Sequence, residues 1–459
     1  MSVDWQEIED WDRQYYLHNI FAKSEYPFTP VEKVDGNYIY LAGGTRLLDF
    51  QSQLISDSLG HRHPAPHRAI EEAMQRYGHV FFGMANEYRA RAAKLLIEDV
   101  IGQAGDWASR VRFLASGTEA VENAITIARL YTGRPIVLTQ AHSFHGLSNG
   151  PTMLRGYRGN ISRGVDYADS YDVPGFSNSG IMPIPAPENA SFSCTGQLPS
   201  LKATEDFIKS VGPKSIAAVM TEPMFGAAGL MPHPDYMRGL IEICRKYKIL
   251  WIDDEVLCGF GRLGEWFGYQ LDDNLYPDLM IVGKAINGCA LPSGGVVLNT
   301  PIADFMESVR WWSGSTWDGH PLVCASIAGT LEYMLESNIV DLVKTKSLYL
   351  KNKLDLLKES HPCVGHIGGA GLYFAVDLVD ANGEPIIKED RDFTFNGDLS
   401  LSPNSIISAE CAAHGVFLGG FVPNTVKCGP PFTITEQEID QAMFAFDKAL
   451  TKVEEKYHH

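Results

Sequence analysis

The sequence lacks the features that mark several broad classes of protein. It has no uninterrupted apolar run near the roughly 18 residues that a membrane-spanning helix needs, and its acidic start, MSVDWQEIEDWDRQYY, lacks the apolar core of a signal peptide. Basic residues are scarce, because 38 Lys and Arg face 56 Asp and Glu, a formal charge of −18. That balance disfavours nucleic acids and anionic membranes as partners. We therefore expect a soluble, cytoplasmic protein.

Paired cysteines are also missing. The eight cysteines contain no CxxC pair, which favours buried free thiols in a reducing compartment over a disulfide framework or a zinc site. We expect no metal centre. The cysteines are Cys194, Cys244, Cys258, Cys289, Cys324, Cys363, Cys411 and Cys428.

Short apolar runs separated by helix-like segments dominate the middle of the chain. Its 459 residues would make about three domains or one large α/β unit. The pattern predicts a mostly parallel sheet with covering helices, preceded by a β-meander around Gly43-Gly44 and followed by a second lobe. The predicted strands span residues 110–115, 134–139, 215–221, 249–253, 278–282 and 294–298, and the clearest helices span residues 118–132 and 236–248.

The first predicted strand leads into Ser116-Gly117-Thr118-Glu119. Ligands of open α/β sheets bind at the carboxyl ends of the strands. The Ser-x-x-Glu spacing is that of a capping box at a helix start, and Gly117 would also let a phosphate approach the bare N–H groups there. The two interpretations are compatible, so this motif alone does not separate a cap from a phosphate site.

The next strand ends carry an aromatic residue and acids. Phe144-His145-Gly146 follows one strand, Glu222 follows another, and Asp253-Asp254-Glu255 ends a third. Three consecutive acids are costly to bury without partners. A cation, a helix cap or a metal would each explain them, with metal disfavoured because no His or Cys cluster accompanies them.

Lys284 follows the apolar strand 278–282 and precedes a glycine-rich turn. A partly dehydrated amine has a lowered pKa and reacts as a nucleophile toward aldehydes. A helix start for phosphate, an aromatic face, a carboxylate and such a lysine together match the needs of pyridoxal 5′-phosphate.

Further motifs extend this set along nearly the whole chain. In order, they are Gly60-His61-Arg62-His63-Pro64, Ser116 to Ala120, Phe144-His145-Gly146, Glu222-Pro223, Asp254 to Arg262, Pro277-Asp278 with Gly283-Lys284, Thr316 to Pro321, and Pro430-Pro431. With them the sequence resembles the class III aminotransferases, a fold-type I pyridoxal-phosphate family, and within it the ω-transaminase branch. Seen as part of that first motif, His61 and His63 are expected in a structural turn, not a metal site.

The resemblance implies an α/β fold of type I with a mostly parallel central sheet and flanking helices. Residues 75–325 would form the large cofactor-binding domain. Residues 1–74 and 326–459 would form a smaller α+β lobe made from both chain ends.

The resemblance also assigns roles to single residues. Lys284 would form the Schiff base with the cofactor and Asp254 would partner the pyridine nitrogen, which makes these two the predicted catalytic residues. Phe144 and Val256 would pack on the two faces of the ring. The full predicted cofactor-binding set is Ser116, Gly117, Thr118, Phe144, His145, Glu222, Asp254, Val256, Lys284 and Thr316.

Thr316 resembles a threonine that reaches the phosphate of the neighbouring subunit. That role implies a homodimer with shared active sites, and leaves the pairing of dimers into tetramers open. The implied activity is transfer of an amino group from an amine or ω-amino acid to an oxo acid, with pyruvate favoured, by a ping-pong Schiff-base mechanism. The alternatives are an epimerase, aminomutase, decarboxylase or phospho-lyase starting from the same Schiff base with the substrate, or a non-catalytic binding protein.

One departure from the family pattern concerns the acceptor. Many relatives place a mobile arginine about ten residues before the Pro-Pro pair, where this chain has Gly419-Gly420. Lys427 and Arg155 are candidates to bind the carboxylate instead. Other aromatics, Phe21 and Trp311-Trp312, would line an apolar pocket or pack in the core.

Overall fold

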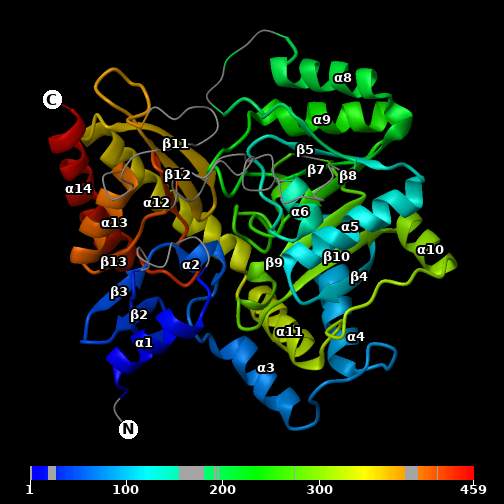
Figure 1. Ribbon diagram of the computed structural model, residues 1–459, viewed down its shortest axis with the longest axis horizontal. Helices are drawn as coiled ribbons and strands as arrows, with labels where there is room; N and C mark the ends of the chain where they lie inside the picture. Colours follow the sequence, from blue (N-terminus) through cyan, green and yellow to red (C-terminus); the bar gives the residue numbers. More distant parts are fainter. Residues whose placement is uncertain are drawn as a thin grey trace.

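A computed structural model describes residues 3–18, 27–154, 180–190, 193, 196–272, 274–387, 402–420 and 422–458 (Figure 1). The helices and strands belong to one large sheet with its covering helices and to two smaller sheets. Within these residues no helix combines the length and apolar character needed to cross a membrane.

Seven strands form the central sheet, in the order β4-β10-β9-β8-β7-β5-β6. The strands from β5 to β9 run parallel, whereas β10 pairs antiparallel with both β4 and β9. All strands except β10 therefore end at one edge of the sheet. Their bounds are β4 (Ala108–Leu114), β5 (Ile136–Gln140), β6 (Ile181–Ile184), β7 (Ile216–Thr221), β8 (Leu250–Asp254), β9 (Leu279–Gly283) and β10 (Gly294–Asn299).

Helices cover both faces of this sheet (Figure 1). Alternate residues of β9 show the two layers, because Leu279 and Ile281 pack with α5 (Gly117–Thr132) and α10 (Thr300–Ser308). Met280 and Val282 instead pack on the other face with α9 (Pro234–Tyr247) and α11 (Pro321–Glu336). A strand buried on both faces has no polar side, which explains the continuous apolar runs in the sequence.

Two smaller sheets lie outside the central one, and the first contains strands from both ends of the chain. The first has the order β1-β2-β3-β13, in which β13 (Val416–Phe417) pairs in parallel with β3 (Arg46–Asp49). The second has the order β11-β12-β14. Their other strands are β1 (Val31–Asp35), β2 (Tyr38–Leu41), β11 (Val364–Ala370), β12 (Tyr373–Leu378) and β14 (Thr425–Cys428). The N-terminal meander is thus joined to C-terminal sequence, while the domain boundaries at residues 74 and 325 stay a prediction.

The remaining helices and helical turns connect or flank these sheets. They are α1 (Trp5–Tyr15), α2 (Ser52–Ile55), α3 (Pro64–Met74), α4 (Glu87–Lys94), η1 (Leu95–Val100), η2 (Ile101–Ala104), α6 (Asn149–Leu154), α8 (Pro199–Val211), η3 (Pro213–Ser215), η4 (Gly268–Leu271), η5 (Lys284–Asn287), α12 (Ile339–Ser360), α13 (Pro403–Ala413) and α14 (Glu436–Tyr457).

Each of the six predicted strands and both predicted helices exists, with ends displaced by one or two residues. The sequence did not predict β6, a short strand at the sheet edge that contains Pro183. Proline has no backbone N–H to donate. An edge strand tolerates it at a position that faces away from the neighbouring strand, where no hydrogen bond between strands is lost.

The helix cap at Ser116 differs in detail from the expected box. Ser116 Oγ accepts from the Glu119 N–H at 3.3 Å, but the Glu119 carboxylate accepts from the N–H of Ala115, at 2.9 Å. The reciprocal bond therefore lies one residue earlier than predicted.

The described cysteines, which are the predicted eight except Cys194, are free thiols. Cys194 lies outside the described residues. Burial raises the pKa of most of them, for example that of Cys244 to about 12, so these thiols are neutral at physiological pH.

His61 joins two buried carboxylates beside the meander. Its Nε2 lies 3.0 Å from Asp49 Oδ2 and its Nδ1 lies 2.6 Å from Asp57 Oδ2. Burial alone would lower the pKa of His61, but the hydrogen bonds to both carboxylates outweigh it and raise the pKa to about 9. His63 accepts from the Ala65 N–H at the start of α3. The two histidines thus have the structural role that the sequence predicted.

We predict that His61→Gln lowers stability most at neutral and acid pH. Because the folded-state pKa lies near 9 and the ordinary value is 6.5, the imidazolium contributes fully below about 6.5 and progressively less as pH rises through 9. The contribution is at most roughly 3 kcal/mol. Denaturant midpoints from pH 6 to 10 measure it, with the surface variant His414→Gln as control. Equal losses for His61→Gln at both ends of that range would contradict the assignment.

Candidate active site

The carboxyl ends of β4, β5, β7, β8 and β9 carry most of the residues predicted for the site. Lys284 directly follows β9 and adopts a positive φ of 43°, a conformation that is uncommon for residues other than glycine. Its side chain is partly exposed, yet burial lowers the pKa of its amine against the opposing influence of Asp254 and Glu222. The neutral, nucleophilic form is therefore easier to reach than in water.

Asp254 ends β8 and is held from two sides. Its Oδ2 lies 2.6 Å from Nδ1 of His145, and its Oδ1 accepts from the Val256 N–H at 3.0 Å. The other ring nitrogen of His145, Nε2, is buried and has no hydrogen-bond partner among the described residues. The Asp254 carboxylate therefore has a fixed orientation, and His145 Nε2 is a buried polar atom with an unsatisfied hydrogen bond.

Glu222 follows β7 and ties two loops together. Its Oε1 accepts from the Phe144 N–H at 2.8 Å and its Oε2 accepts from the Gly226 N–H at 3.0 Å. Burial, opposed by His145 and these hydrogen bonds, raises its pKa to about 7. The Phe144 ring itself is half-buried. Glu222 thus fixes the backbone of Phe144, and it holds or releases a proton near neutral pH.

Val256 lies between two glycines of the predicted site. A Cβ on Gly117 would lie 3.2 Å from Val256 Cγ2, and one on Gly283 would lie 3.3 Å from Val256 Cγ1. Gly117 is the first residue of α5, where N–H groups lack helical partners. The glycines let the helix start and the end of β9 approach the same valine.

Thr118 belongs to a hydrogen-bonded group that the sequence did not reveal. Its Oγ1 lies 2.8 Å from Ser148 Oγ, which in turn donates to Glu122 at 2.9 Å. A Cβ on Gly146 would come within 2.4 Å of Thr118 Oγ1. Ser148 and Glu122 therefore orient Thr118. The only local sign of this group in the sequence is the short Ser-Asn-Gly segment at residues 148–150.

The three consecutive acids point in different directions. Residues alternate across a strand, so Asp253 and Glu255 share the face opposite Asp254. Both are buried, and Glu255 Oε1 accepts from the Tyr269 N–H at 2.9 Å. Burial, with repulsion from Glu255, raises the pKa of Asp253. Burial likewise raises the pKa of Glu255 to about 7. The raised pKa values favour the protonated, neutral forms, which lowers the cost of burying these two acids.

Some predicted residues are not brought to this site by the single chain. Thr316 is exposed in a turn, and Trp312 is 98% exposed. Trp311 packs beside the core under the guanidinium of Arg112. Phe21 and Arg155 lie outside the described residues.

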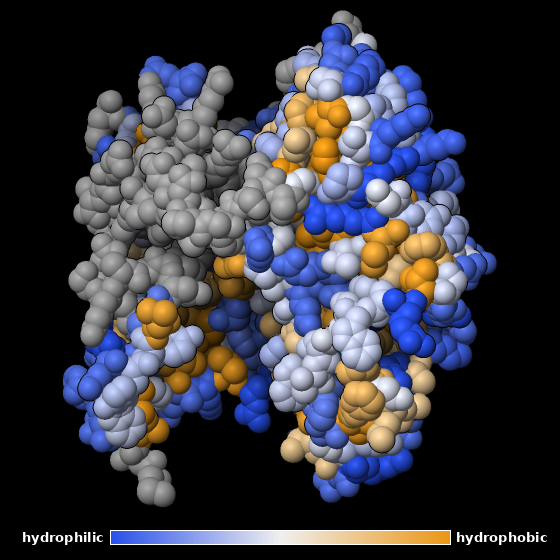
Figure 2. Space-filling model, turned by 45° about the vertical axis from the view of Figure 1, so that its right-hand side comes forward, coloured by the Kyte–Doolittle hydropathy of each residue, from blue (hydrophilic) through white to orange (hydrophobic). Residues whose placement is uncertain are grey.

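Lys427, in β14, does reach the site. Its Nζ donates to the Ala227 carbonyl at 2.9 Å and to the Gly226 carbonyl at 3.4 Å. Because Glu222 accepts from the N–H of Gly226, a single residue, Gly226, links the lysine to the carboxylate. Figure 2 shows a hollow in the surface of the molecule, with apolar residues inside it.

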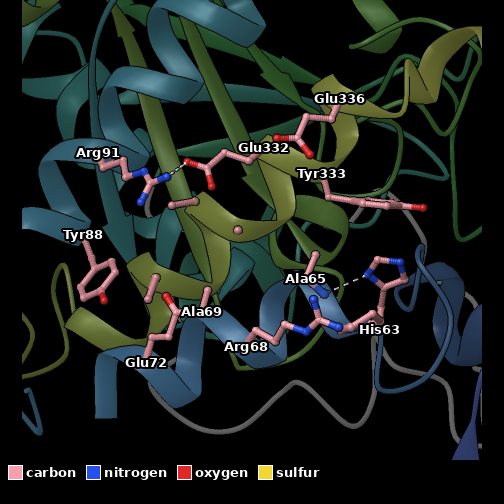
Figure 3. A pocket seen from close by; sticks show the side chains of 14 residues that line it. His63, Ala65, Arg68, Ala69, Glu72, Tyr88, Arg91, Glu332, Tyr333 and Glu336 are labelled. Atoms are coloured by element: carbon pink, nitrogen blue, oxygen red, sulfur yellow. Dashed lines mark hydrogen bonds and ion pairs between the residues drawn. The ribbon is translucent and has the colours of Figure 1, made fainter. Parts of the chain in front are cut away.

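A separate pocket of about 470 Å³ lies between α3, α4 and α11 (Figure 3). Its polar lining is largely self-satisfied, since Arg91 pairs with Glu332 and the His63 ring lies against Tyr333. None of its lining residues is a lysine, cysteine, serine or threonine. It offers no lysine amine that could bond to an aldehyde, so the chemistry is assigned to the strand ends around Lys284.

Comparison with known proteins identifies relatives of this chain. The family described as aminotransferase class-III matches residues 20–450. A crystal structure of an S-selective transaminase from Bacillus megaterium is 38% identical, with a TM-score of 0.94 and 99% of each chain covered. An S-selective transaminase from Arthrobacter sp. with alanine bound is 38% identical, with a TM-score of 0.93 and 99% of each chain covered.

A more distant structure contains a cofactor. The taurine:2-oxoglutarate aminotransferase from Bifidobacterium kashiwanohense, in complex with pyridoxal phosphate and glutamate, is 28% identical, with a TM-score of 0.88 and 100% of each chain covered. Pyridoxal phosphate is the cofactor of this fold, and the residues present here fit it. The glycine at the start of α5 leaves N–H groups open to a phosphate, Asp254 is a rigid acceptor, and His145 Nε2 is an unpartnered polar atom.

We predict that Gly117→Val weakens retention of pyridoxal phosphate about tenfold or more, because the added methyl groups collide with Val256 and crowd the helix start. Dialysis followed by cofactor absorbance measures this effect. Gly102→Ala is the control, since its Cβ would meet only the Ile97 carbonyl, at 3.6 Å. Retention equal to wild type in Gly117→Val would refute this placement of the phosphate.

Proposed function

The chain belongs to the class III aminotransferases, and from that premise we propose that it transfers an amino group from an amine or ω-amino acid to an oxo acid, with pyruvate as acceptor. The observation that carries the proposal is Lys284, a partly exposed amine with a lowered pKa beside two carboxylates. Such a group both attacks an aldehyde and moves protons near neutral pH.

Each residue has a distinct task in this reaction. Bound pyridoxal phosphate supplies an aldehyde that condenses with amines and a ring that accepts electron density as a substrate C–H bond breaks. Lys284 Nζ would take the proton from that carbon and deliver it to the former aldehyde carbon, so that the amino group stays with the cofactor. Asp254, fixed by His145, would keep the ring nitrogen protonated through its negative charge. Glu222 keeps the loop that bears Phe144 in place.

The choice of pyruvate as acceptor rests on a related structure and on the chemical relation between pyruvate and alanine. Alanine, bound in the Arthrobacter structure, is what pyruvate becomes when it accepts an amino group. The reverse half-reaction uses the same residues. An epimerase, aminomutase, decarboxylase or phospho-lyase would use the same lysine and aspartate, so the stoichiometry decides between them.

A panel of amines and ω-amino acids tested against pyruvate and 2-oxoglutarate examines this proposal. Transamination predicts that each amine consumed yields one new amino acid, and that no amine is consumed when the oxo acid is omitted. Loss of amine without an oxo acid, or without a new amino acid, would contradict it and favour the alternatives.

We predict that Lys284→Ala leaves the chain folded but lowers turnover by about a thousandfold or more, because the variant loses both nucleophile and proton carrier. Circular dichroism and the initial rate with pyruvate measure the two properties. Lys214→Ala, a substitution in the turn before β7, is the control. Wild-type turnover in Lys284→Ala would overturn the assignment.

We also propose a homodimer, supported by an exposed aromatic patch around Thr316. The patch is formed by two segments that pack together, because Asn86 donates to the Gly319 carbonyl at 3.3 Å. Such a patch on a single chain marks a protein interface. Its members, all exposed, are Phe81, Phe82, Met84, Trp312 and Trp317. A second subunit that covered this patch would bring Thr316 toward the active site of that subunit.

We predict that Trp312→Asp shifts the chain toward monomers, because a buried charge at the patch opposes association. Sedimentation velocity at micromolar concentration measures the shift. Leu348→Asp, an equally non-conservative change at an exposed position of α12, is the control and should leave the assembly unchanged. The dimer would not be formed by this patch if both variants sediment like wild type.

A further inference from the structure

Two lysines border one part of the site from different sheets. Lys284 follows β9 of the central sheet, whereas Lys427 lies in β14 of a small sheet. Each side chain keeps partial exposure although its surroundings are largely protein. Burial, and then repulsion by Lys284, lower the pKa of Lys427 to about 8, against attraction by Glu222. The two amines are therefore close enough to interact across the same space.

The contacts of Lys427 include no salt bridge among the described residues. Its two acceptors, the carbonyls of Ala227 and Gly226, are neutral, and no carboxylate oxygen of the described residues forms a salt bridge with it. An ammonium group has three N–H donors, so one remains for a ligand. A partly buried cation without a counter-ion is costly, which points to an anion that is present only when substrate binds.

Gly420 lies beside Lys427. A Cβ at that position would lie 3.9 Å from Lys427 Cε and 3.2 Å from Asn404 Nδ2, so a larger side chain there would crowd the lysine. The Gly226 peptide fixes the amine on the other side, since its carbonyl also accepts from the Tyr373 hydroxyl at 2.7 Å and its N–H donates to Glu222. Lys427 is thus held in place by its contacts with residues 226 and 227, and its side chain keeps partial exposure.

We propose that Lys427 is the specificity-determining residue that binds the carboxylate of the oxo acid acceptor and of the amino acid formed from it. The inference rests on the proposed transamination and deepens it by naming how a carboxylate is distinguished from a carboxylate-free amine. Lys427 makes no bond to the reacting carbon, and an amine donor without a carboxylate does not need it.

The test compares the two half-reactions of the holoenzyme in Lys427→Gln and wild type. In a ping-pong reaction each substrate has its own kcat/KM. The value for pyruvate is expected to fall about ten- to a hundredfold, the usual loss for a charge-assisted hydrogen bond, while the value for a carboxylate-free amine donor changes less than about twofold. Lys427→Met, which keeps the side-chain length without any donor, should behave alike.

Lys346→Gln is the matched control. Lys346 is another partly exposed lysine, which donates to the Phe432 carbonyl at 2.7 Å and whose pKa is lowered by burial. Its loss should affect the two half-reactions equally. An equal loss for pyruvate and for the amine in Lys427→Gln would show that Lys427 only supports the turn at residues 226–227, and would overturn the proposal.

A binding measurement separates this proposal from the proposed function. Propanoate, a carboxylate without a keto group, should raise the thermal midpoint of the wild-type holoenzyme and leave that of Lys427→Gln unchanged. If the wild type transaminates but propanoate stabilises both proteins equally, the role of Lys427 is wrong. If propanoate distinguishes them and no oxo acid accepts an amino group, the proposed function is wrong and the carboxylate site stands.

Discussion

Removal of water from charged groups at the carboxyl edge of the central sheet is the constraint on which the site depends. The apolar strands that build the core deliver the buried Asp254 and Glu222 and the partly exposed Lys284 to one edge of the sheet. Burial lowers the pKa of Lys284 and raises that of Glu222. The two acids have fixed hydrogen-bond partners. Asp254 lies against His145, and Glu222 accepts from the Gly226 N–H.

The strand pattern accounts for what the sequence could predict. Short continuous apolar runs, whose residues alternate between the two covered faces of the sheet, located the six predicted strands and placed the candidate residues at one edge. Family motifs then assigned the roles, because Lys284 and Asp254 lie in long matching runs. The same alternation explains why Asp253 and Glu255 face away from Asp254, although three consecutive acids look equivalent in the sequence.

The remaining features depend on contacts between distant parts of the chain. The link from Lys427 to Gly226 joins residues 201 apart, and no local pattern indicates it. Ser148 and Glu122, which orient Thr118, become neighbours only when the loop after β5 folds over the start of α5. Sequence reasoning identifies single functional residues more readily than the residues that hold them.

The most direct measurement of the central claim locates the lysine that bonds to the cofactor. Borohydride reduction of the pyridoxal-phosphate-loaded protein, followed by proteolysis and mass spectrometry, fixes the attachment site. The account predicts a pyridoxyl group on Lys284 and none on Lys427, because Lys284 is the amine at the end of β9 beside Asp254 and Glu222. A pyridoxyl group on Lys427, or on any lysine other than Lys284, would contradict it.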